Sequence, residues 1–228
     1  MPKETRTMVI FTEGYTEKQL AAIERSVTRF GGTMVRVNSS KELVNYVNAK
    51  STECMQLTPE RTNDKITNMD IYAHGVVGKI EFGYHMEKKG YEAEASFDES
   101  SSAGLSKGAF KGLASCVTSY ACRTGSGNKD IDWAKGMFQS DQRDESLAQD
   151  ISNSSGAVVK AYFRRSSYVG TLGNAVDRRM STLYPVPQQQ NIDGAAFTPN
   201  GSNRPVTPGS SPVGTDPNQQ THTPKMPR

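Results

Sequence analysis

The sequence has no long apolar run. Its apolar stretches are short, and the N-terminal residues MPKETRTMVIFTEG contain none that is long enough for a signal peptide or a membrane span. We therefore expect a soluble protein that is made in the cytoplasm and has no membrane partner. Export by a route that needs no signal peptide stays compatible with these residues.

Cysteine and histidine are also scarce, with three of each in 228 residues. Cys54, Cys116 and Cys122 are odd in number and show no framework spacing, and the cysteines and histidines lack the paired spacing typical of a zinc site. We expect unpaired thiols and no bound metal ion. Most lone cysteines are small buried hydrophobic residues, and we interpret Cys54 and Cys116 in this way.

A concentrated basic stripe is missing as well. The formal charge is +3, and basic and acidic residues are interspersed, so we expect no nucleic-acid partner. Neither GxxxxGK[ST] nor GxGxxG occurs, and no cofactor is expected. A nucleotide- or phosphate-binding α/β protein is therefore the weaker alternative.

Proline is nearly absent before Tyr184 and frequent after it. Nine of the eleven prolines lie at or beyond Pro185, among Gln, Asn, Ser, Thr and Gly residues. Such a segment cannot bury enough apolar surface to offset its chain entropy. We predict one folded domain over residues 1–184, and over residues 185–228 a disordered tail that is a linker, a partner-binding segment or a simple terminus.

Within residues 1–184 the apolar pattern alternates between strand and helix. Strands are expected at Thr7–Thr12, Thr33–Val37, Ile66–Ala73, Lys79–Tyr84, Cys116–Ala121 and Ala157–Phe163. Helices are expected at residues 16–30, after Ser39 or Ser40, at Lys107–Ser115 and at Ile131–Asp150. This alternation predicts an α/β fold with a mostly parallel sheet that is covered by helices on both faces.

Three polar segments between these elements are predicted to be loops. Residues 51–65 are typical of a surface loop, residues 85–106 of a flexible flap, and residues 122–129 of a flexible polar loop. In the predicted helix between the last two, Phe110 and Leu113 are expected to face inward.

Two reactive side chains follow predicted strands. His74 comes directly after Ile66–Ala73, and Cys122 comes directly after Cys116–Ala121. The carboxyl ends of parallel strands meet at one edge of a sheet, where ligands bind. A thiol and an imidazole at that edge are the minimum for nucleophilic cysteine chemistry. Taken singly, each residue is more often structural, and His85 is the reserve candidate for the imidazole.

The residues after Cys122, RTGSGN, include glycines. Glycine lets the main chain approach a substrate closely, so the N–H groups of this loop are candidates for binding an oxyanion.

The pieces DIYAHG, GKIEFG and SYACRTG, in this order, resemble the caspase, legumain and gingipain superfamily of cysteine peptidases. In that superfamily a strand ends in His-Gly and a later strand ends in Ala-Cys; here 48 positions separate His74 from Cys122. The chain is more similar to bacterial members, including the caspase-like domains called CHAT and the self-processing domains of secreted toxins. The resemblance covers Thr7 to Phe163 and implies a caspase-like three-layer sandwich with a mostly parallel central sheet flanked by helices.

The same resemblance implies a cysteine endopeptidase with a His74–Cys122 dyad. Cys122 would attack a peptide carbonyl and form an acyl-enzyme thioester, and His74 would protonate the leaving amine. The N–H groups of Gly75 and Cys122 would hold the oxyanion, and no third catalytic residue is required. Such a protein would act on a protein or peptide, as a bacterial effector or a self-processing protease. The alternative is an inactive caspase-like module for binding or scaffolding.

Substrate-binding positions also come from the resemblance. Some arginine-specific relatives have an acidic residue two places before the nucleophile, where this chain has Tyr120, so no preference for basic substrates is implied. Arg164, Arg165 and Ser166 match the segment that pairs with the substrate backbone. The arginines would favour an acidic substrate side chain, or they are solvated at a strand end. The toxin domains are activated by inositol hexakisphosphate on a basic surface, which the dispersed basic residues here do not match.

Overall fold

The computed structural model describes residues 5–10, 21, 24, 31–82, 96–121, 123–127, 142–162 and 219–225. For residues 5–10, His74 and Gln219 the description covers the backbone only. Among the described residues, no helix is long and apolar enough to cross a membrane.

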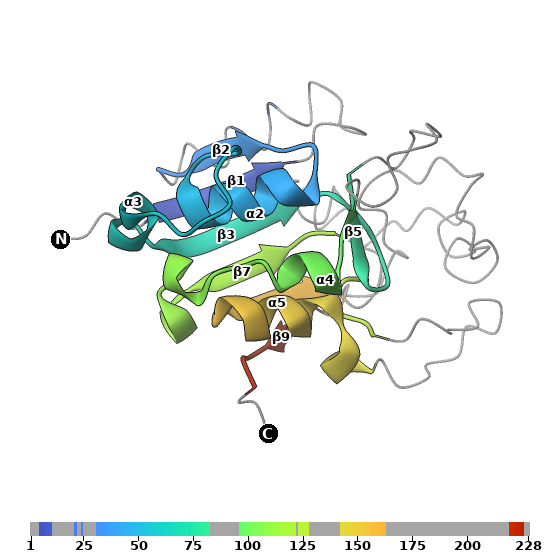
Figure 1. Ribbon diagram of the computed structural model, residues 1–228. Helices are drawn as coiled ribbons and strands as arrows, with labels where there is room; N and C mark the ends of the chain where they lie inside the picture. The colour runs from blue at the N-terminus through green and yellow to red at the C-terminus, as the bar shows by residue number, and fades with distance from the viewer. Residues whose placement is uncertain are drawn as a thin grey trace.

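A six-stranded sheet forms the centre of the described structure (Figure 1), in the order β2-β1-β3-β7-β8-β9. Its strands are β1 (Thr5–Ile10), β2 (Thr33–Arg36), β3 (Ile66–Tyr72), β7 (Cys116–Ser119), β8 (Val158–Tyr162) and β9 (Gln219–His222). All neighbours are parallel except β8 and β9, which are antiparallel. The predicted α/β class with a mostly parallel sheet is therefore confirmed.

A second, smaller sheet follows β3 in the chain. It is antiparallel, with three strands in the order β4 (His74–Val76), β5 (Lys79–Glu81) and β6 (Ser96–Phe97). In Figure 1, β5 stands at the end of the molecule toward which the arrowheads of β3 and β7 point. This small sheet therefore borders the carboxyl edge of the large one.

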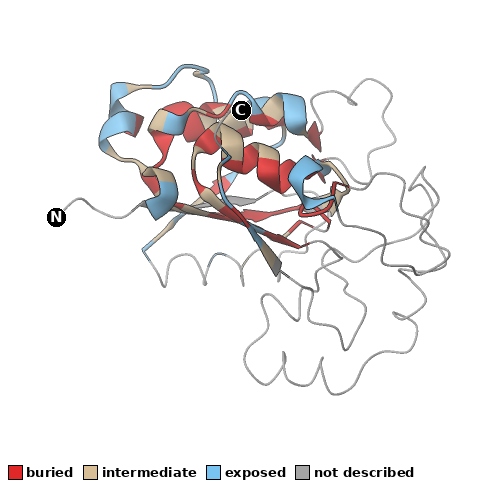
Figure 2. Ribbon diagram, turned by 90° about the horizontal axis from the view of Figure 1, so that it is seen from below, coloured by how far each residue is buried: buried red, intermediate tan, exposed pale blue. Residues whose placement is uncertain are grey.

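The described helices lie over one face of the large sheet (Figure 2). They are α2 (Ser40–Ala49), α3 (Pro59–Asn63), α4 (Glu99–Ser102) and α5 (Leu147–Ser155), accompanied by the 3-10 turns η1 (Lys107–Ala109), η2 (Gly112–Ala114) and η4 (Arg143–Glu145). The prediction that helices cover both faces is not tested for the opposite face. Of the helix predicted at residues 16–30, only residues 21 and 24 are described, and both are helical.

The hydrophobic core lies between this face and the helices. Alternate strand residues such as Met69, Val117 and Val159 are buried there, together with Leu43 of α2 and Ile151 of α5. The helical spacing of α2 is the pattern that the sequence showed. The helix predicted at Ile131–Asp150 is wrong for residues 142–146, because α5 begins only at Leu147, after the 3-10 turn η4 and the capping Ser146. Apolar contact between the two layers is the main source of stability for such an arrangement.

The caps of α2 and α5 explain where these helices begin and end. The Ser39 hydroxyl oxygen accepts a hydrogen bond from the Glu42 N–H, and the Ser146 hydroxyl oxygen accepts one from the Gln149 N–H. Each bond satisfies a backbone donor that has no partner inside the helix. After α5 the chain turns at Gly156, whose φ of 73° suits glycine.

Several predicted loops contain regular structure. Residues 51–65 include α3, which begins after Thr58 because its hydroxyl oxygen caps the Arg61 N–H. The predicted flap over residues 85–106 is wrong for residues 96–102, which form β6 and α4. Asp98 caps α4, and this explains the helix: its carboxylate accepts hydrogen bonds from the Ser101 N–H and hydroxyl.

The helix predicted at Lys107–Ser115 is also wrong, because η1 and η2 replace it. Gly112 has a φ of 61°, in the left-handed region, and this interrupts any right-handed helix. Phe110 is buried as predicted, but Leu113 is 70% exposed instead of facing inward.

The prediction of a disordered tail is wrong for residues 219–225. Gln219–His222 form the edge strand β9, paired with β8. Backbone partners on β8 and polar side chains on α5 supply the hydrogen bonds that composition alone could not reveal. The predicted boundary after Tyr184 lies outside the described residues and stays a prediction.

Candidate functional site

The carboxyl ends of β3 and β7 lie side by side. The strands are parallel neighbours whose register pairs Ile71 with Ser119, and the Tyr120 N–H donates to the Ile71 carbonyl at 2.9 Å. Each strand runs into the same pair of residues, Tyr-Ala, before His74 on one and Cys122 on the other. The two predicted catalytic positions therefore follow matching points on adjacent strands.

Tyrosine rings mark this edge of the sheet. The Tyr72 and Tyr120 rings stack with their centroids 4.4 Å apart, at an interplanar angle of 10°. Tyr162, at the end of β8, lies 6.2 Å from Tyr120 in a tilted arrangement. Such ring pairs add about 0.5–1.5 kcal/mol beyond their area burial. The three rings thus hold three neighbouring strand ends together, and only Tyr120 is half-exposed.

His74 is the first residue of β4, two positions after the end of β3. In the antiparallel pair with β5, His74 lies opposite Glu81, and Gly75 lies opposite Ile80. A turn was expected at Gly75–Gly78, but Gly75 and Val76 belong to β4, and the turn is limited to Val77 and Gly78. The φ of Gly78 is 77°, which requires the conformational freedom of glycine. Gly75 is half-buried, so its main chain is close to the surface of the site.

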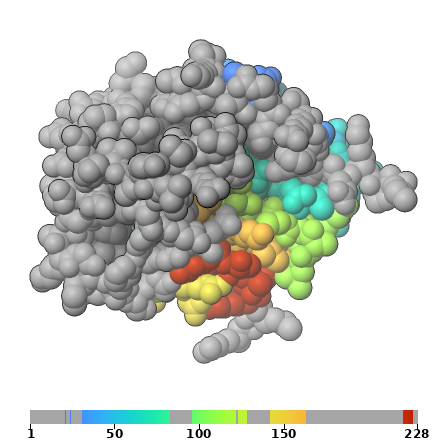
Figure 3. All heavy atoms as spheres, turned by 180° about the vertical axis from the view of Figure 1, so that it is seen from behind, coloured from blue at the N-terminus to red at the C-terminus, as the bar shows by residue number. Residues whose placement is uncertain are grey.

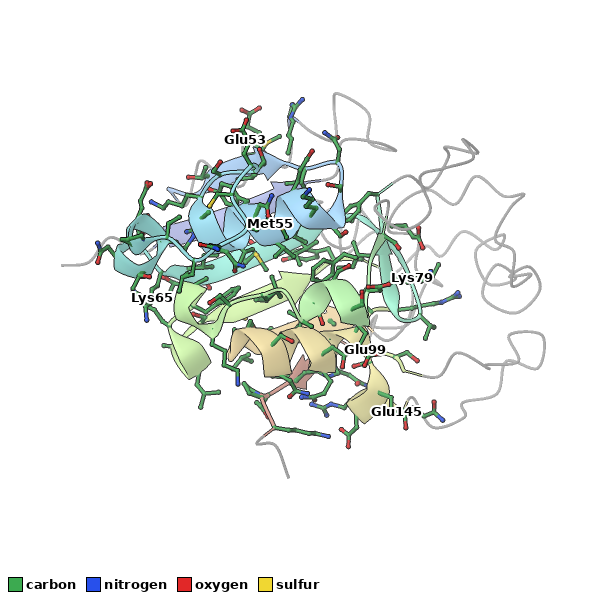
Figure 4. The ribbon with its side chains drawn as sticks, viewed as in Figure 1. Glu53, Met55, Lys65, Lys79, Glu99 and Glu145 are labelled. Atoms are coloured by element: carbon green, nitrogen blue, oxygen red, sulfur yellow. The ribbon has the colours of Figure 1, made fainter. Side chains whose placement is uncertain are left out.

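Glu81 is the carboxylate that the register brings opposite His74. Burial raises the pKa of Glu81 above its usual range, and the charge of Lys79 opposes that rise. Figure 4 shows Lys79 projecting outward from β5. Residues directly opposite in an antiparallel pair have their Cβ atoms about 4.5–5.5 Å apart, within interaction range. A partly desolvated carboxylate therefore belongs to the candidate site.

Cys122 lies outside the described residues, but both of its neighbours are described. Ala121 is completely buried, and Arg123 is only 2% exposed. Arg123 also has a φ of 62°, a left-handed conformation that costs a non-glycine residue roughly 1–2 kcal/mol. Backbone strain of this kind is concentrated at functional sites.

The loop after Cys122 was predicted to be flexible, and this is wrong for residues 123–127. Thr124 and Ser126 are buried, the Gly125 N–H donates to the Tyr162 carbonyl, and the Thr124 carbonyl accepts from the Ala148 N–H of α5. The Thr124 hydroxyl donates to the Ala121 carbonyl at 3.1 Å and lies 2.9 Å from the Ser119 hydroxyl. These contacts fasten the loop to β7, β8 and α5.

Close packing around Gly125 and Gly127 explains why the loop of residues 123–127 is fixed in place. A Cβ atom on Gly125 would lie 3.2 Å from the Ala161 carbonyl oxygen, and one on Gly127 would clash with the backbone of Gln142 and Glu145. Glycine serves here for close backbone approach within the protein. The Gly125 and Ser126 N–H groups are engaged internally, which corrects the prediction that this loop offers them to an oxyanion.

The other predicted positions are the substrate-binding residues, the reserve histidine and the two remaining cysteines. Arg164, Arg165 and Ser166, and the reserve histidine His85, lie outside the described residues. Cys54 and Cys116 are half-buried rather than buried, so the interpretation of both as interior residues is wrong. Cys54 lies in the loop after α2, and Cys116 begins β7 with its side chain on the less buried face.

Sequence reasoning missed Tyr72, Tyr162 and Glu81 as members of the site. The repeated pattern Tyr-Ala-His and Tyr-Ala-Cys was a readable signal for Tyr72, because it predicts matching positions on paired strands. Tyr162 and Glu81 depend on strand order and hairpin register, which no local pattern specifies.

Among the described residues, no group of His, Cys, Asp and Glu side chains could hold a metal ion. In comparisons with known proteins, no protein-family model matches this chain, and no curated protein and no solved structure gives a significant match.

Proposed function

We propose that this protein is a cysteine endopeptidase of the caspase-like type, with Cys122 as nucleophile and His74 as general acid. The observation that carries the proposal is the register of β3 and β7. It pairs Ile71 with Ser119, and counting on by three positions from each leads to His74 and Cys122. Neighbouring strands are about 4.8 Å apart, which is the scale on which a thiol and an imidazole can share one peptide bond.

In the proposed reaction the Cys122 thiolate attacks the carbonyl carbon of the substrate. The C–S bond forms, and the carbonyl oxygen becomes an oxyanion held by the N–H groups of Gly75 and Cys122. The C–N bond then breaks as His74 gives its proton to the leaving amine, which leaves a thioester. Water attacks the thioester, releases the carboxylate product and restores the thiol.

Arg123 supports the assignment of Cys122. A cation next to a cysteine favours the thiolate, because it stabilises the negative charge that forms on sulfur. Here the cation is a buried guanidinium on the residue adjacent to the cysteine. Partial removal from water strengthens its electrostatic effect.

Glu81 supports the assignment of His74 as the general acid, and Glu81 itself is proposed as a positioning residue. A carboxylate opposite the histidine can accept a hydrogen bond from the imidazole, fix its orientation and stabilise its protonated form. Glu81→Gln should therefore shift the alkaline limb of the pH–rate profile to lower pH. Glu81→Asp should restore part of that shift, whereas a purely structural role would leave the profile in place.

The experiment is labelling with an electrophilic peptide probe. Because Cys54 and Cys116 are half-buried and can react, the full-length chain should carry Cys54→Ser and Cys116→Ser, so that Cys122 is its single thiol. We expect labelling of Cys122, loss of labelling with His74→Ala, and retention with His85→Ala as the matched control. Cleavage of a peptide library, read by mass spectrometry, gives the specificity.

One observation favours a second candidate, a non-catalytic module of the same architecture. Both neighbours of Cys122 are buried, and a sulfur sealed in the same way could not reach a substrate. A folded single-thiol chain that neither reacts with the probe nor cleaves any peptide would support that candidate and overturn the peptidase proposal.

A further inference from the structure

The C-terminal segment 219–225 pairs with β8 and is hydrogen-bonded to side chains of α5. Its strand β9 runs antiparallel to β8, with Val159 opposite His222 and Tyr162 opposite Gln219. Figure 3 shows the atoms of this segment, in red, lying against the orange and yellow atoms of β8, η4 and α5. Pro224 has no N–H group to donate and ends the strand.

Side chains of α5 bind the backbone of the segment. The Gln149 amide nitrogen donates to the Thr223 carbonyl at 2.8 Å. The Ser152 hydroxyl donates to the Ala157 carbonyl at 2.8 Å, and the His222 carbonyl oxygen lies 3.4 Å from the same hydroxyl as a weaker second acceptor. The Asn153 carbonyl oxygen accepts from the Lys225 N–H at 2.9 Å. Contacts to main-chain groups of an extended segment are how proteins bind peptides by strand addition.

The side chain of His222 provides a specific contact. It is fully buried, and its Nδ1 lies 3.5 Å from the hydroxyl of Ser146, the N-cap residue of α5. The flanking residues Thr221 and Thr223 are exposed, as alternation along a strand requires. His222 is therefore the residue of this strand whose side chain is enclosed by the domain.

A surface ion pair lies at the end of the segment. The Lys225 ammonium group is 2.6 Å from an Asp144 carboxylate oxygen, and its hydrogen bond and charge lower the pKa of Asp144. Both side chains are largely exposed, so this pair contributes little to affinity.

The groove has the features of a built binding site. Gln149 and Ser152 are polar, are at most 2% exposed, and lie on a short helix that also covers the core. Each already has a partner within the domain, Asn153 for Gln149 and the Ala157 carbonyl for Ser152, and the segment adds the bond from Gln149 to the Thr223 carbonyl. Removing it would leave the Gln149 amide without its bond to Thr223 and expose the edge of β8.

We propose that β8 and α5 form a peptide-binding groove and that residues 219–225 are its built-in ligand. The ligand class is an extended peptide with His at the buried position, followed by Thr-Pro-Lys. The contacts are non-covalent and come from residues far away in the chain, so the segment acts as a separable ligand. This proposal does not depend on the chemistry of Cys122.

The test uses the full chain carrying His222→Ala, which weakens the built-in ligand and leaves the groove intact. A synthetic peptide of residues 219–225, QQTHTPK, should bind this variant and raise its melting temperature, because a ligand that binds only the folded state stabilises it. The wild-type chain, whose groove is filled, should show little change. A His222→Ala peptide should bind at least about tenfold more weakly, and a Thr221→Ala peptide should bind like the original.

A second arm covers the case in which the variant does not fold. A specific protease site inserted between Pro199 and Pro205 of the wild-type chain is cut after folding. The C-terminal fragment should then stay with the domain during gel filtration and be displaced by excess peptide. Loss of the fragment on cutting, or equal binding of the His222→Ala and Thr221→Ala peptides, would overturn the proposal.

Discussion

The segments that follow β3 and β7 begin alike and end in opposite environments. Both start with Tyr-Ala, both contain a candidate catalytic residue in third place, and both continue through glycines. After β3, residues 74–81 fold into a hairpin in which residues 75–78 and Glu81 are half-exposed and Lys79 is exposed. After β7, residues 123–127 are buried and hydrogen-bonded to β8 and α5.

The difference shows that neighbours, rather than composition, decide whether a polar loop is buried. The loop after β7 lies between the end of β8 and the start of α5, and both offer backbone partners. The hairpin after β3 instead forms its own small sheet with β6. The nucleophile position is thus attached to the rigid core, whereas the acid position belongs to a separate sheet.

The largest effect should come from removing either reactive side chain. If the two segments form one site, Cys122→Ala and His74→Ala should each lower peptide hydrolysis by about a thousandfold or more, and the double variant should be no worse than the worse single variant. Initial rates on a cleaved library peptide provide the measurement. Two independent, additive losses would show that the residues do not act as a unit.

The next largest effect is a difference in stability between two glycine substitutions, one at a closely packed position and one at a position with a left-handed φ. Gly127→Ala should lower the free energy of unfolding by about 3 kcal/mol, because its Cβ would clash with the backbone of Gln142 and Glu145. Gly78→Ala should cost only roughly 1–2 kcal/mol, the cost of a left-handed φ. Urea titration of both variants measures the difference. Equal losses would contradict the contrast between the two segments.

A smaller effect is expected from the buried hydroxyl pair. Thr124→Val keeps the shape of the side chain but removes the bond to the Ala121 carbonyl and the partner of the Ser119 hydroxyl, at a cost of about 1–3 kcal/mol. Thr118→Val, at a half-exposed position on β7, is the matched control. A double-mutant cycle with Ser119→Ala should give a measurable coupling energy. No coupling would mean that the pair does not fasten the loop.

The smallest effect is the pH dependence of the hairpin. Because the pKa of Glu81 is raised by burial, the folded protein binds this proton more tightly than the unfolded chain does. Its contribution to stability is complete below the ordinary pKa of 4.5 and is lost as the pH rises through the raised value. Glu81→Gln should remove that loss over the same window. Unfolding curves recorded at several pH values test this, and identical profiles would contradict it.

Local pattern predicted the elements whose causes are local. Ser39 was one of the expected N-caps, and α2 begins directly after it. The apolar runs of β3 and β7 were found within a few residues of their observed bounds. These apolar runs predicted that His74 and Cys122 follow strands, and the register of those strands supports their pairing.

What the sequence could not show depends on tertiary partners. Gln219–His222 are polar and lie near prolines. They form a strand because the side of β8 away from β7 offers backbone partners, and because Gln149 of α5 binds the residue that follows the strand. Burial of Thr124 and Ser126 likewise depends on α5 and β8, which lie later in the chain. Propensity cannot encode such contacts, since they join segments that are distant in sequence.

Because β9 is close to the C-terminus of the sequence, it is the last strand of the large sheet to be synthesised. The ribosome makes β8 well before residues 219–222, so for that interval the backbone groups of Val159 and Ala161 that later pair with β9 have no permanent strand beside them. An open edge of this kind invites pairing with other nascent chains. A chaperone that shields strand edges should therefore improve the yield of the native protein more than one that only covers apolar surface.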